Sequence, residues 1–361
     1  EEGKFYVWRP QEMEAVLGAE EARRLCAWFD ISSDGNWEGN SIAHTPQPLA
    51  FVARKLGLSP EALRASIDAA RPKLYAAREK RVHPGLDDKI LTAWNGLMIG
   101  AFATAARVLD EPRYLAQAQR AADFLWRVLR RPDGQLLRTC RGERAHLDAY
   151  LEDYAYLAEG MLDLYEADGN PQTLERVRTL VERMLSDFLD PASGAFFDTA
   201  THHEKLLYRT REGHDGATPS ANATAASVLA RLSVHLDHAP YAERARAALM
   251  AYATGWERTP WAFCKATMAW QFLEGAPQEL VLVGKPGSPD REALWRAVQA
   301  IYVPYSVIAQ SAGDVPSELP LLRGKTRVGD RAALYVCRQY TCNAPITDPA
   351  AVASGLSPAM R

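Results

Sequence analysis

Three groups of side chains in this 361-residue sequence combine carboxylates, imidazoles and aromatic rings. Carboxylates act as general acids and bases, histidine transfers protons near neutral pH, and aromatic faces stack on sugar rings. The mixture therefore predicts carbohydrate chemistry. The groups are Asp87, Asp88, Lys89, Trp94 and Asn95; His146, Asp148, Tyr150, Glu152, Asp153 and Tyr154; and Tyr208, Arg209, His214, Asp215, Ser220 and Asn222.

The residue types in these groups leave two reactions open. A glycoside hydrolase would pair Asp88 with a second carboxylate about 5 to 10 Å away, from Glu152, Asp153 or Asp215. An epimerase would use one of the two histidines to remove a proton beside a carbonyl, and another group would return it. We predict catalytic roles for Asp88, His146, Asp153, His214 and Asp215, and substrate binding for Asp87, Lys89, Trp94, Asn95, Tyr150, Glu152, Tyr154, Arg209 and Asn222.

Many of these side chains also suit purely structural roles. Asp, Ser and Asn at helix starts accept hydrogen bonds from free backbone N–H groups, so Asp153, Ser220 and Asn222 are also candidate N-caps. One of Asp87 and Asp88 is a further candidate cap. For Tyr150, Tyr154 and Tyr156 the structural role is core packing with a polar tip, and for Lys89 it is an ion pair with a neighbouring carboxylate.

A repeated pair of helices positions the three groups. Pro112, Pro171 and Pro240 each follow a short turn, and proline is favoured in the first turn of a helix. A second helical segment precedes each proline. The first of these, residues 93–107, carries no charge until its last residue and is expected to be buried nearly all round. The helix after Pro112 has apolar residues at every third or fourth position and so buries one face.

Alternating inner and outer helices predict a mainly α fold, an (α/α) toroid in which each helix pair is buried against its neighbours. Further helices are expected near residues 10–29, 59–80 and 259–273, which brings the count close to that of a six-hairpin barrel. The lengths of the connections between helices indicate which end of the toroid carries the functional residues. Inner-to-outer turns are short, whereas outer-to-inner connections cover residues 131–148 and 190–218 and are expected to contain short β-hairpins at 133–137 and 193–197.

Long loops carry binding residues, and these two open at the N-terminal ends of inner helices. Free N–H groups and the positive end of the helix dipole suit hydroxyl or anionic ligands. We therefore expect the three groups to form a polar mouth at this end of the toroid.

Composition excludes several classes of partner. The formal net charge is −3 with Lys and Arg scattered among the acids, so no nucleic acid is expected. No apolar run reaches the roughly 18 residues needed to cross a bilayer, so no membrane segment is expected. We expect a small sugar-like ligand, no cofactor and no metal. His202 and His203 lack a third ligand at metal-binding spacing and are assigned to a loop.

The five cysteines are odd in number and spread along the chain, which argues against a disulfide framework and favours a reducing, cytoplasmic location. Cys337 and Cys342 lie close together, but four residues separate them. That spacing fits neither common redox motifs nor zinc motifs, so structural thiols are expected.

Six stretches, spread from one end of the chain to the other, resemble the C-terminal part of the spermatogenesis-associated protein 20 family, which includes the bacterial YyaL-like thioredoxin-domain-containing proteins. They are EEGKFYVW from Glu1, NWEGNSI from Asn36, HPGLDDKILTAWNGLMI from His83, YLEDYAYLAEGMLDLYEA from Tyr150, DGATPSANA from Asp215 and ALYVCRQYTCNAPITDP from Ala333.

The resemblance implies that a thioredoxin-like domain precedes this region in the full-length protein, and a start at Glu1 fits a trimmed chain. It also implies a helical part similar to six-hairpin glycosidases and N-acylglucosamine 2-epimerases, with a carbohydrate role. The alternative is a non-catalytic module that binds a protein or ligand for the thioredoxin-like domain. A pocket lined by Trp94, Tyr150 and the acids favours the first function, whereas pairing of those acids into caps and salt bridges favours the second.

We expect two domains, a barrel over residues 1–275 and a small α/β segment over 276–361 packed on it. Apolar runs at 279–284, near 307 and from 332, with a helix near 289–302 between the first two, form a βαβ-like pattern. The GKPGSP stretch after the first run lacks the spacing of a nucleotide-binding loop and is expected to be a plain turn.

Overall fold

The computed structural model describes residues 3–142, 144–313 and 318–356. It contains two compact units, Glu1–Asp87 and Asp88–Arg361. Each unit has a hydrophobic core of its own. The division at residue 87 differs from the boundary expected near 275, and the assignment of separate domains to residues 1–275 and 276–361 stays a prediction.

In its described part, from residue 3 on, the first unit is a group of four helices beside a pair of two-residue strands. Trp8, Leu25, Leu63 and Ile67 lie in its core. The helix predicted over residues 10–29 is interrupted at Gly18, whose φ of 83° is in the region that favours glycine. The elements are β1 (Val7–Trp8), α1 (Pro10–Leu17), α2 (Ala19–Phe29), β2 (Ser41–Ile42), α3 (Leu49–Leu56) and α4 (Pro60–Arg78).

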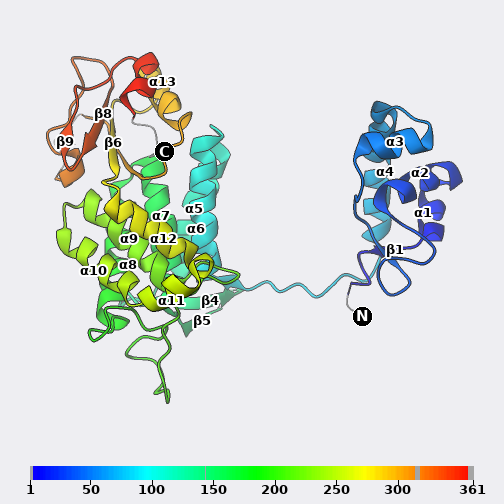
Figure 1. Ribbon diagram of the computed structural model, residues 1–361, viewed down its shortest axis with the longest axis horizontal. Helices are drawn as coiled ribbons and strands as arrows, with labels where there is room; N and C mark the ends of the chain where they lie inside the picture. Colours follow the sequence, from blue (N-terminus) through cyan, green and yellow to red (C-terminus); the bar gives the residue numbers. More distant parts are fainter. Residues whose placement is uncertain (1–2, 143, 314–317, 357–361) are drawn as a thin grey trace. The chain divides into compact units, whose positions relative to one another are not determined.

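The second unit is built from helical hairpins, as predicted. Its helices α5, α7 and α9 are each followed by an outer helix, and α5 packs on α7, α7 on α9 and α9 on α12 (Figure 1). The hairpins are α5 (Thr92–Val108) with α6 (Pro112–Val128), α7 (Leu151–Asp168) with α8 (Pro171–Asp187), and α9 (Ala221–His235) with α10 (Ala239–Met250), followed by α11 (Ala253–Arg258) and α12 (Cys264–Glu274).

Local sequence explains where these helices begin and which are inner. Pro112 and Pro171 are the first residues of α6 and α8, and Pro240 is the second of α10, as predicted from their turns. Helix α7 is buried on nearly every side. Helix α5, which was expected to be buried nearly all round, is not, because Trp94, Met98 and Val108 on its other face are exposed. The mainly α fold class with alternating inner and outer helices of the toroid type is confirmed, and closure into a six-hairpin ring stays a prediction.

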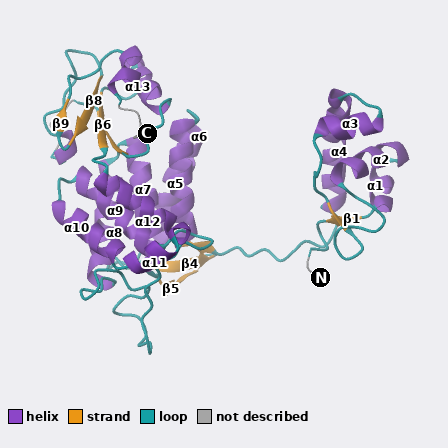
Figure 2. Cartoon of the chain, in the orientation of Figure 1, coloured by secondary structure: helices purple, strands orange, loops and turns teal. Residues whose placement is uncertain are grey.

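Short β structure caps the two ends of these helices (Figure 2). At the end where α5 and α7 begin, β3 (Ile90–Leu91), β4 (Leu137–Arg141) and β5 (Arg144–Asp148) form an antiparallel sheet. The hairpin expected at 133–137 is a turn closed by a bridge between Arg130 and Leu136, and it leads into β4. The second expected hairpin, at 193–197, is a single bridge between Leu189 and Phe196.

The C-terminal residues form the expected α/β segment against the other end of the helices. Strand β6 (Gln278–Val283) pairs in parallel with β7 (Ser306–Ser311) after the crossover helix α13 (Pro289–Gln299), and pairs antiparallel with β8 (Ala333–Arg338). Val281, Val283 and Val307 join the core of the helical hairpins, so the segment is packed on them. The short elements that follow are β9 (Thr341–Cys342) and α14 (Val352–Gly355), with 3-10 turns at Pro260–Phe263, Pro320–Leu322 and Pro349–Ala351.

The prediction of structural thiols at Cys337 and Cys342 is wrong, because the two form a disulfide. Strands β8 and β9 pair antiparallel, which places these two residues directly opposite one another. Arg338 and Thr341 between them are also paired, and Gln339 and Tyr340 form the turn of the hairpin. Among the described residues, none of the helices combines the length and apolarity needed to span a bilayer.

Candidate functional site

Asp153, a predicted catalytic residue, joins the starts of two inner helices. Its Oδ1 accepts a hydrogen bond from Ala93 N (3.0 Å) at the start of α5, and its Oδ2 accepts one from Tyr150 N (2.9 Å) at the start of α7. The carboxylate is fully buried, and Arg138 Nη1 lies 3.2 Å from Oδ2. Burial raises the pKa of Asp153 to about 7, although Arg138 and these hydrogen bonds oppose the shift.

Asp215 likewise joins the starts of two helices, α9 and α12. Its Oδ1 accepts a hydrogen bond from Ser220 N and its Oδ2 one from Lys265 N, both at 2.8 Å. Ser220 in turn caps α9 through Ala223 N (3.2 Å). The buried Asn222 amide exchanges two hydrogen bonds with the backbone of Phe196, at 2.7 and 3.0 Å. The capping role thus describes the contacts of Asp153 and Ser220, and Asn222 ties a loop to α9.

Most other charged residues of the predicted mouth form ion pairs or hydrogen bonds with neighbours. Asp88 Oδ1 lies 2.5 Å from Arg141 Nε, and Glu152 Oε1 lies 2.8 Å from Arg138 Nη1. The remaining contacts are His214 Nδ1 with Glu212 Oε1 at 2.7 Å, His146 Nδ1 with the Arg144 carbonyl at 3.3 Å, the Arg209 guanidinium with the Thr199 carbonyl, and interactions of Asp87 and Lys89 with partners of their own.

The aromatic residues of the mouth differ in exposure. Trp94 is exposed, Tyr150 lies under the guanidinium of Arg138, and Tyr154 is buried with its hydroxyl accepting a hydrogen bond from Leu136 N (2.8 Å). Asn95 donates to the Leu91 carbonyl, one turn before it in the chain. The catalytic and binding roles of the mouth residues stay predictions, whereas their capping and pairing contacts are those expected of structural roles.

A cavity of about 650 Å³ lies between α5, α7, α9, α12 and the residues after α13. It is lined by other residues than those of the predicted mouth. Three cations, Arg107, Arg231 and Lys265, and three carboxylates, Glu159, Asp163 and Glu166, line it together with Tyr302, Tyr305, Met268 and Phe272. We call it the central cavity.

The charged groups of the central cavity form a dense set of ion pairs. Lys265 Nζ lies 2.6 Å from Glu159 Oε1, which also accepts a hydrogen bond from Ser227 Oγ (3.0 Å). Arg231 Nη2 lies 2.8 Å from Asp163 Oδ1 and 3.1 Å from Glu166 Oε1. Two further groups contact Glu166, the buried His235 Nε2 at 3.1 Å and Arg107 Nη1 at 3.5 Å.

These charges shift two carboxylates of one helix in opposite directions. Burial raises the pKa of Asp163, and the charges of Glu159 and Glu166 add to this against the attraction of Arg231. Burial also acts on Glu166, but Arg231, His235 and Arg107 outweigh it and lower the pKa of Glu166 to about 2. Neighbouring carboxyl groups whose pKa values are shifted in opposite directions are an arrangement typical of acid–base sites.

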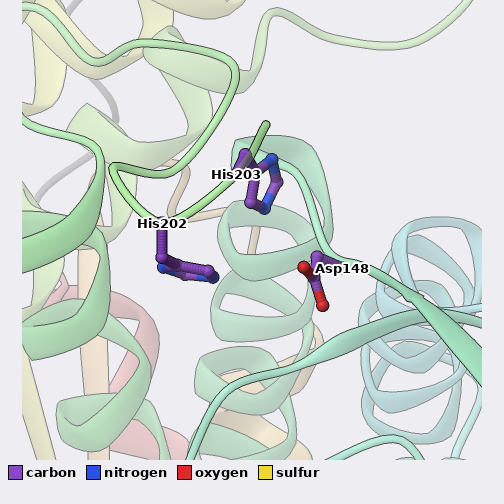
Figure 3. A group of neighbouring side chains, drawn as sticks. All are labelled: Asp148, His202 and His203. Atoms are coloured by element: carbon purple, nitrogen blue, oxygen red, sulfur yellow. The ribbon is translucent and has the colours of Figure 1, made fainter. Parts of the chain in front are cut away.

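His202 and His203, assigned to a loop without a ligand partner, lie beside Asp148 (Figure 3). One ligand atom from each of the three lies within 4.8 Å of the others. The third ligand was missing from the sequence pattern because Asp148 ends β5, far from the histidines along the chain. These residues could hold a metal ion.

The comparison with known proteins identifies relatives over almost the whole chain. This chain is 33% identical to spermatogenesis-associated protein 20 of Mus musculus over 97% of the chain's own length. It is 32% identical to the Homo sapiens protein over 99% of the chain's own length. The chain is a relative of spermatogenesis-associated protein 20. The predicted family resemblance is confirmed. The chain spans about half of these relatives, 48% and 50% of their length, and no family model matches it.

The solved structures that resemble this chain, a relative of spermatogenesis-associated protein 20, have low sequence identity to it. A GH76 α-mannanase of Bacteroides thetaiotaomicron has a TM-score of 0.44 at 12% identity, over 66% of this chain and 68% of its own. The cellobiose 2-epimerase of Bacillus thermoamylovorans has a TM-score of 0.40 at 15% identity, over 47% and 46%.

Sequence reasoning missed the acids of the central cavity, although a signal existed. Glu159, Asp163 and Glu166 are spaced by four and three residues, so they lie along one face of a helix that is otherwise largely apolar and buried. Buried acids on such a face need cationic partners, because burial of an unpaired charge costs much free energy. Those cations come from α5, α9 and α12, and no short-range pattern connects them with α7.

Proposed function

We propose that residues 88–361 bind and process a neutral, hydroxyl-rich carbohydrate in the central cavity. The observation that carries this proposal is the set of ion pairs that joins Glu159 to Lys265 and Asp163 to Arg231 on the wall of a 650 Å³ cavity. Ligand cavities of this size suit small molecules, and a few placed polar groups orient such ligands. The carbohydrate is the ligand class predicted from the sequence.

The charge balance of the cavity supports a neutral ligand. Three cations face three carboxylates, and each cation has a carboxylate partner. A phosphorylated or carboxylated ligand would have to compete for cations that are already paired, at a large desolvation cost. Sugar hydroxyls both donate and accept hydrogen bonds, so they can join these groups without breaking the ion pairs. Met268, Phe272 and Tyr302 supply apolar and aromatic surface.

Asp163 is the residue we assign to proton transfer. A quarter of its side chain is exposed, more than the 14% of Glu159. Its raised pKa keeps the carboxyl protonated to higher pH than an ordinary aspartate, as a general acid requires. Glu159, fixed by Lys265 and Ser227, is the second carboxylate of the proposed site.

Binding is tested by thermal shift and calorimetry of the full chain with neutral mono- and disaccharides, and with sugar phosphates for comparison. We expect at least one neutral sugar to raise the melting temperature; a ligand at 100 times its dissociation constant stabilises by about 2.7 kcal/mol. Asp163→Asn is expected to weaken binding or lower turnover by at least about tenfold. Met268→Trp fills the cavity without changing its charge and should block the same ligand.

Asp88→Asn is the matched control, since it changes an acid of the predicted mouth that lies outside the central cavity. It should leave binding unchanged. If Asp88→Asn abolishes binding while Met268→Trp does not, the ligand occupies the mouth and this proposal is wrong. If no neutral sugar binds, the carbohydrate function fails altogether.

A non-catalytic binding module is the second candidate, because the acids of the mouth are engaged in caps and ion pairs. It predicts a ligand that binds in the cavity and is never converted. A sugar that binds the parent chain and is recovered unchanged after prolonged incubation, with Asp163→Asn binding it equally well, would support this candidate. In this second proposal, the module binds the ligand or protein on behalf of a thioredoxin-like domain in the full-length protein.

A further inference from the structure

Two distant segments of the second unit bring a pair of imidazoles to a carboxylate. Asp148 is the last residue of β5, and His202 and His203 lie in a turn between α8 and α9. Figure 3 shows the three side chains directed toward a common space. Their ligand atoms lie within 4.8 Å of one another.

The backbone and neighbouring rings hold His203 in this position. Thr201 N donates to the Asp187 carbonyl (2.9 Å) and His203 N to the Ala200 carbonyl (3.2 Å), which fixes the turn. The His203 ring packs edge-on against Tyr150, with centroids 5.6 Å apart, and against Phe188. Its Nε2 is buried and has no hydrogen-bond partner in the described part of the chain. A buried ring nitrogen without a partner costs free energy that a bound cation would recover.

We propose that Asp148, His202 and His203 bind a divalent transition-metal ion of the zinc class. Two imidazole nitrogens and one carboxylate oxygen are borderline donors that suit Zn²⁺ and its neighbours. In a tetrahedral site with bonds of about 2.0 to 2.1 Å, ligand atoms are about 3.3 Å apart. The exposed His202 side chain can close the remaining gap by rotation. Three protein ligands leave the fourth position for water or another ligand.

The charges around the group set the conditions for binding. Arg131 Nη2 lies 2.6 Å from Asp148 Oδ1 and is the competitor of the metal for this carboxylate.

Metal binding is tested on the tag-free full chain after EDTA treatment and dialysis. We expect calorimetry with Zn²⁺ near pH 7 to show one equivalent, and Co²⁺ to give the visible absorption of a low-coordinate nitrogen and oxygen site. His202→Ala, His203→Ala and Asp148→Asn should each weaken binding by about tenfold or more. Arg131→Gln should strengthen it, because the competing cation is removed. If the ion pair between Arg131 and Asp148 served structure alone, Arg131→Gln would not increase the affinity for Zn²⁺.

His146→Ala is the matched control, since this histidine is on the same strand but outside the group. It should bind Zn²⁺ like the parent. Absence of binding by the parent chain at about 1 mM Zn²⁺ would overturn the proposal. So would an equal loss in His146→Ala, or full binding in all three ligand variants. Far-UV circular dichroism of each metal-free variant separates a lost ligand from a lost fold.

Discussion

Asp153 and Glu152 are adjacent acids that both contact Arg138, and only one of them also holds the backbone. Asp153 accepts hydrogen bonds from Ala93 N and Tyr150 N, whereas Glu152 has a third of its side chain exposed in its ion pair. We expect Asp153→Ala to lower the free energy of unfolding by about 3 kcal/mol, because two N–H groups at helix starts lose their acceptor. Glu152→Ala should cost about 1 kcal/mol or less.

Urea unfolding of the two variants, compared with the parent, measures the difference. Equal losses would mean that Arg138, and not the two backbone N–H groups, is the partner that matters. A catalytic role for Asp153 is a separate matter, since a variant that still folds can be tested for turnover.

At the scale of helices, the contact between α5 and α7 depends on glycine. A Cβ atom added to Gly160 would lie 2.1 Å from the carbonyl oxygen of Gly96, a backbone atom that cannot rotate away. We expect Gly160→Ala to separate the two helices and to destabilise the second unit by more than about 4 kcal/mol. Gly216→Ala is the control, because its Cβ would meet no atom within 4 Å.

Thermal melts of both variants, followed by circular dichroism, test this expectation. A Gly160→Ala variant that melts like the parent would show that α5 and α7 do not pack as closely as their glycines indicate. Of the two variants, we expect only Gly216→Ala to have a melting temperature close to that of the parent.

The elements predicted from the sequence are those whose signals are local. Pro112 and Pro171 determine helix starts through their fixed φ and missing N–H, so they marked α6 and α8 without tertiary information. The residues of the central cavity could not be found this way. Lys265 meets Glu159 across 106 residues of chain, and only the packing of α12 beside α9, and of α9 beside α7, brings them together.

The same limit explains the metal ligands and the mouth. Asp148 and His203 lie on either side of the α7/α8 hairpin in the chain, so a search for ligands at short spacing could not join them. The positions of Asp153 and Asp215 near helix starts follow from the sequence, yet residue type alone does not separate a cap from a catalyst. Hydrogen-bond geometry shows the structural contacts, because both oxygens of each carboxylate accept from backbone N–H groups.

At the scale of the whole molecule, the two units have separate cores. The core of residues 1–87 is made by Trp8, Met13, Leu25, Leu63 and their neighbours, and the second unit has clusters of its own. Every residue of the central cavity and of the proposed metal site lies in residues 88–361. A chain that begins at Asp88 should therefore fold alone, because a unit with its own core has the burial it needs for stability.

We expect the chain that begins at Asp88 to melt cooperatively, within a few degrees of the second unit in the full chain, and to bind Zn²⁺ and neutral sugars with unchanged affinity. Calorimetry and binding titrations on both chains measure this. If the shortened chain is stable but loses the sugar alone, the ligand site needs residues 1–87 as well as the central cavity. If it does not fold at all, the hairpins that begin at α5 depend on the first four helices for their stability, and the separate cores are not sufficient.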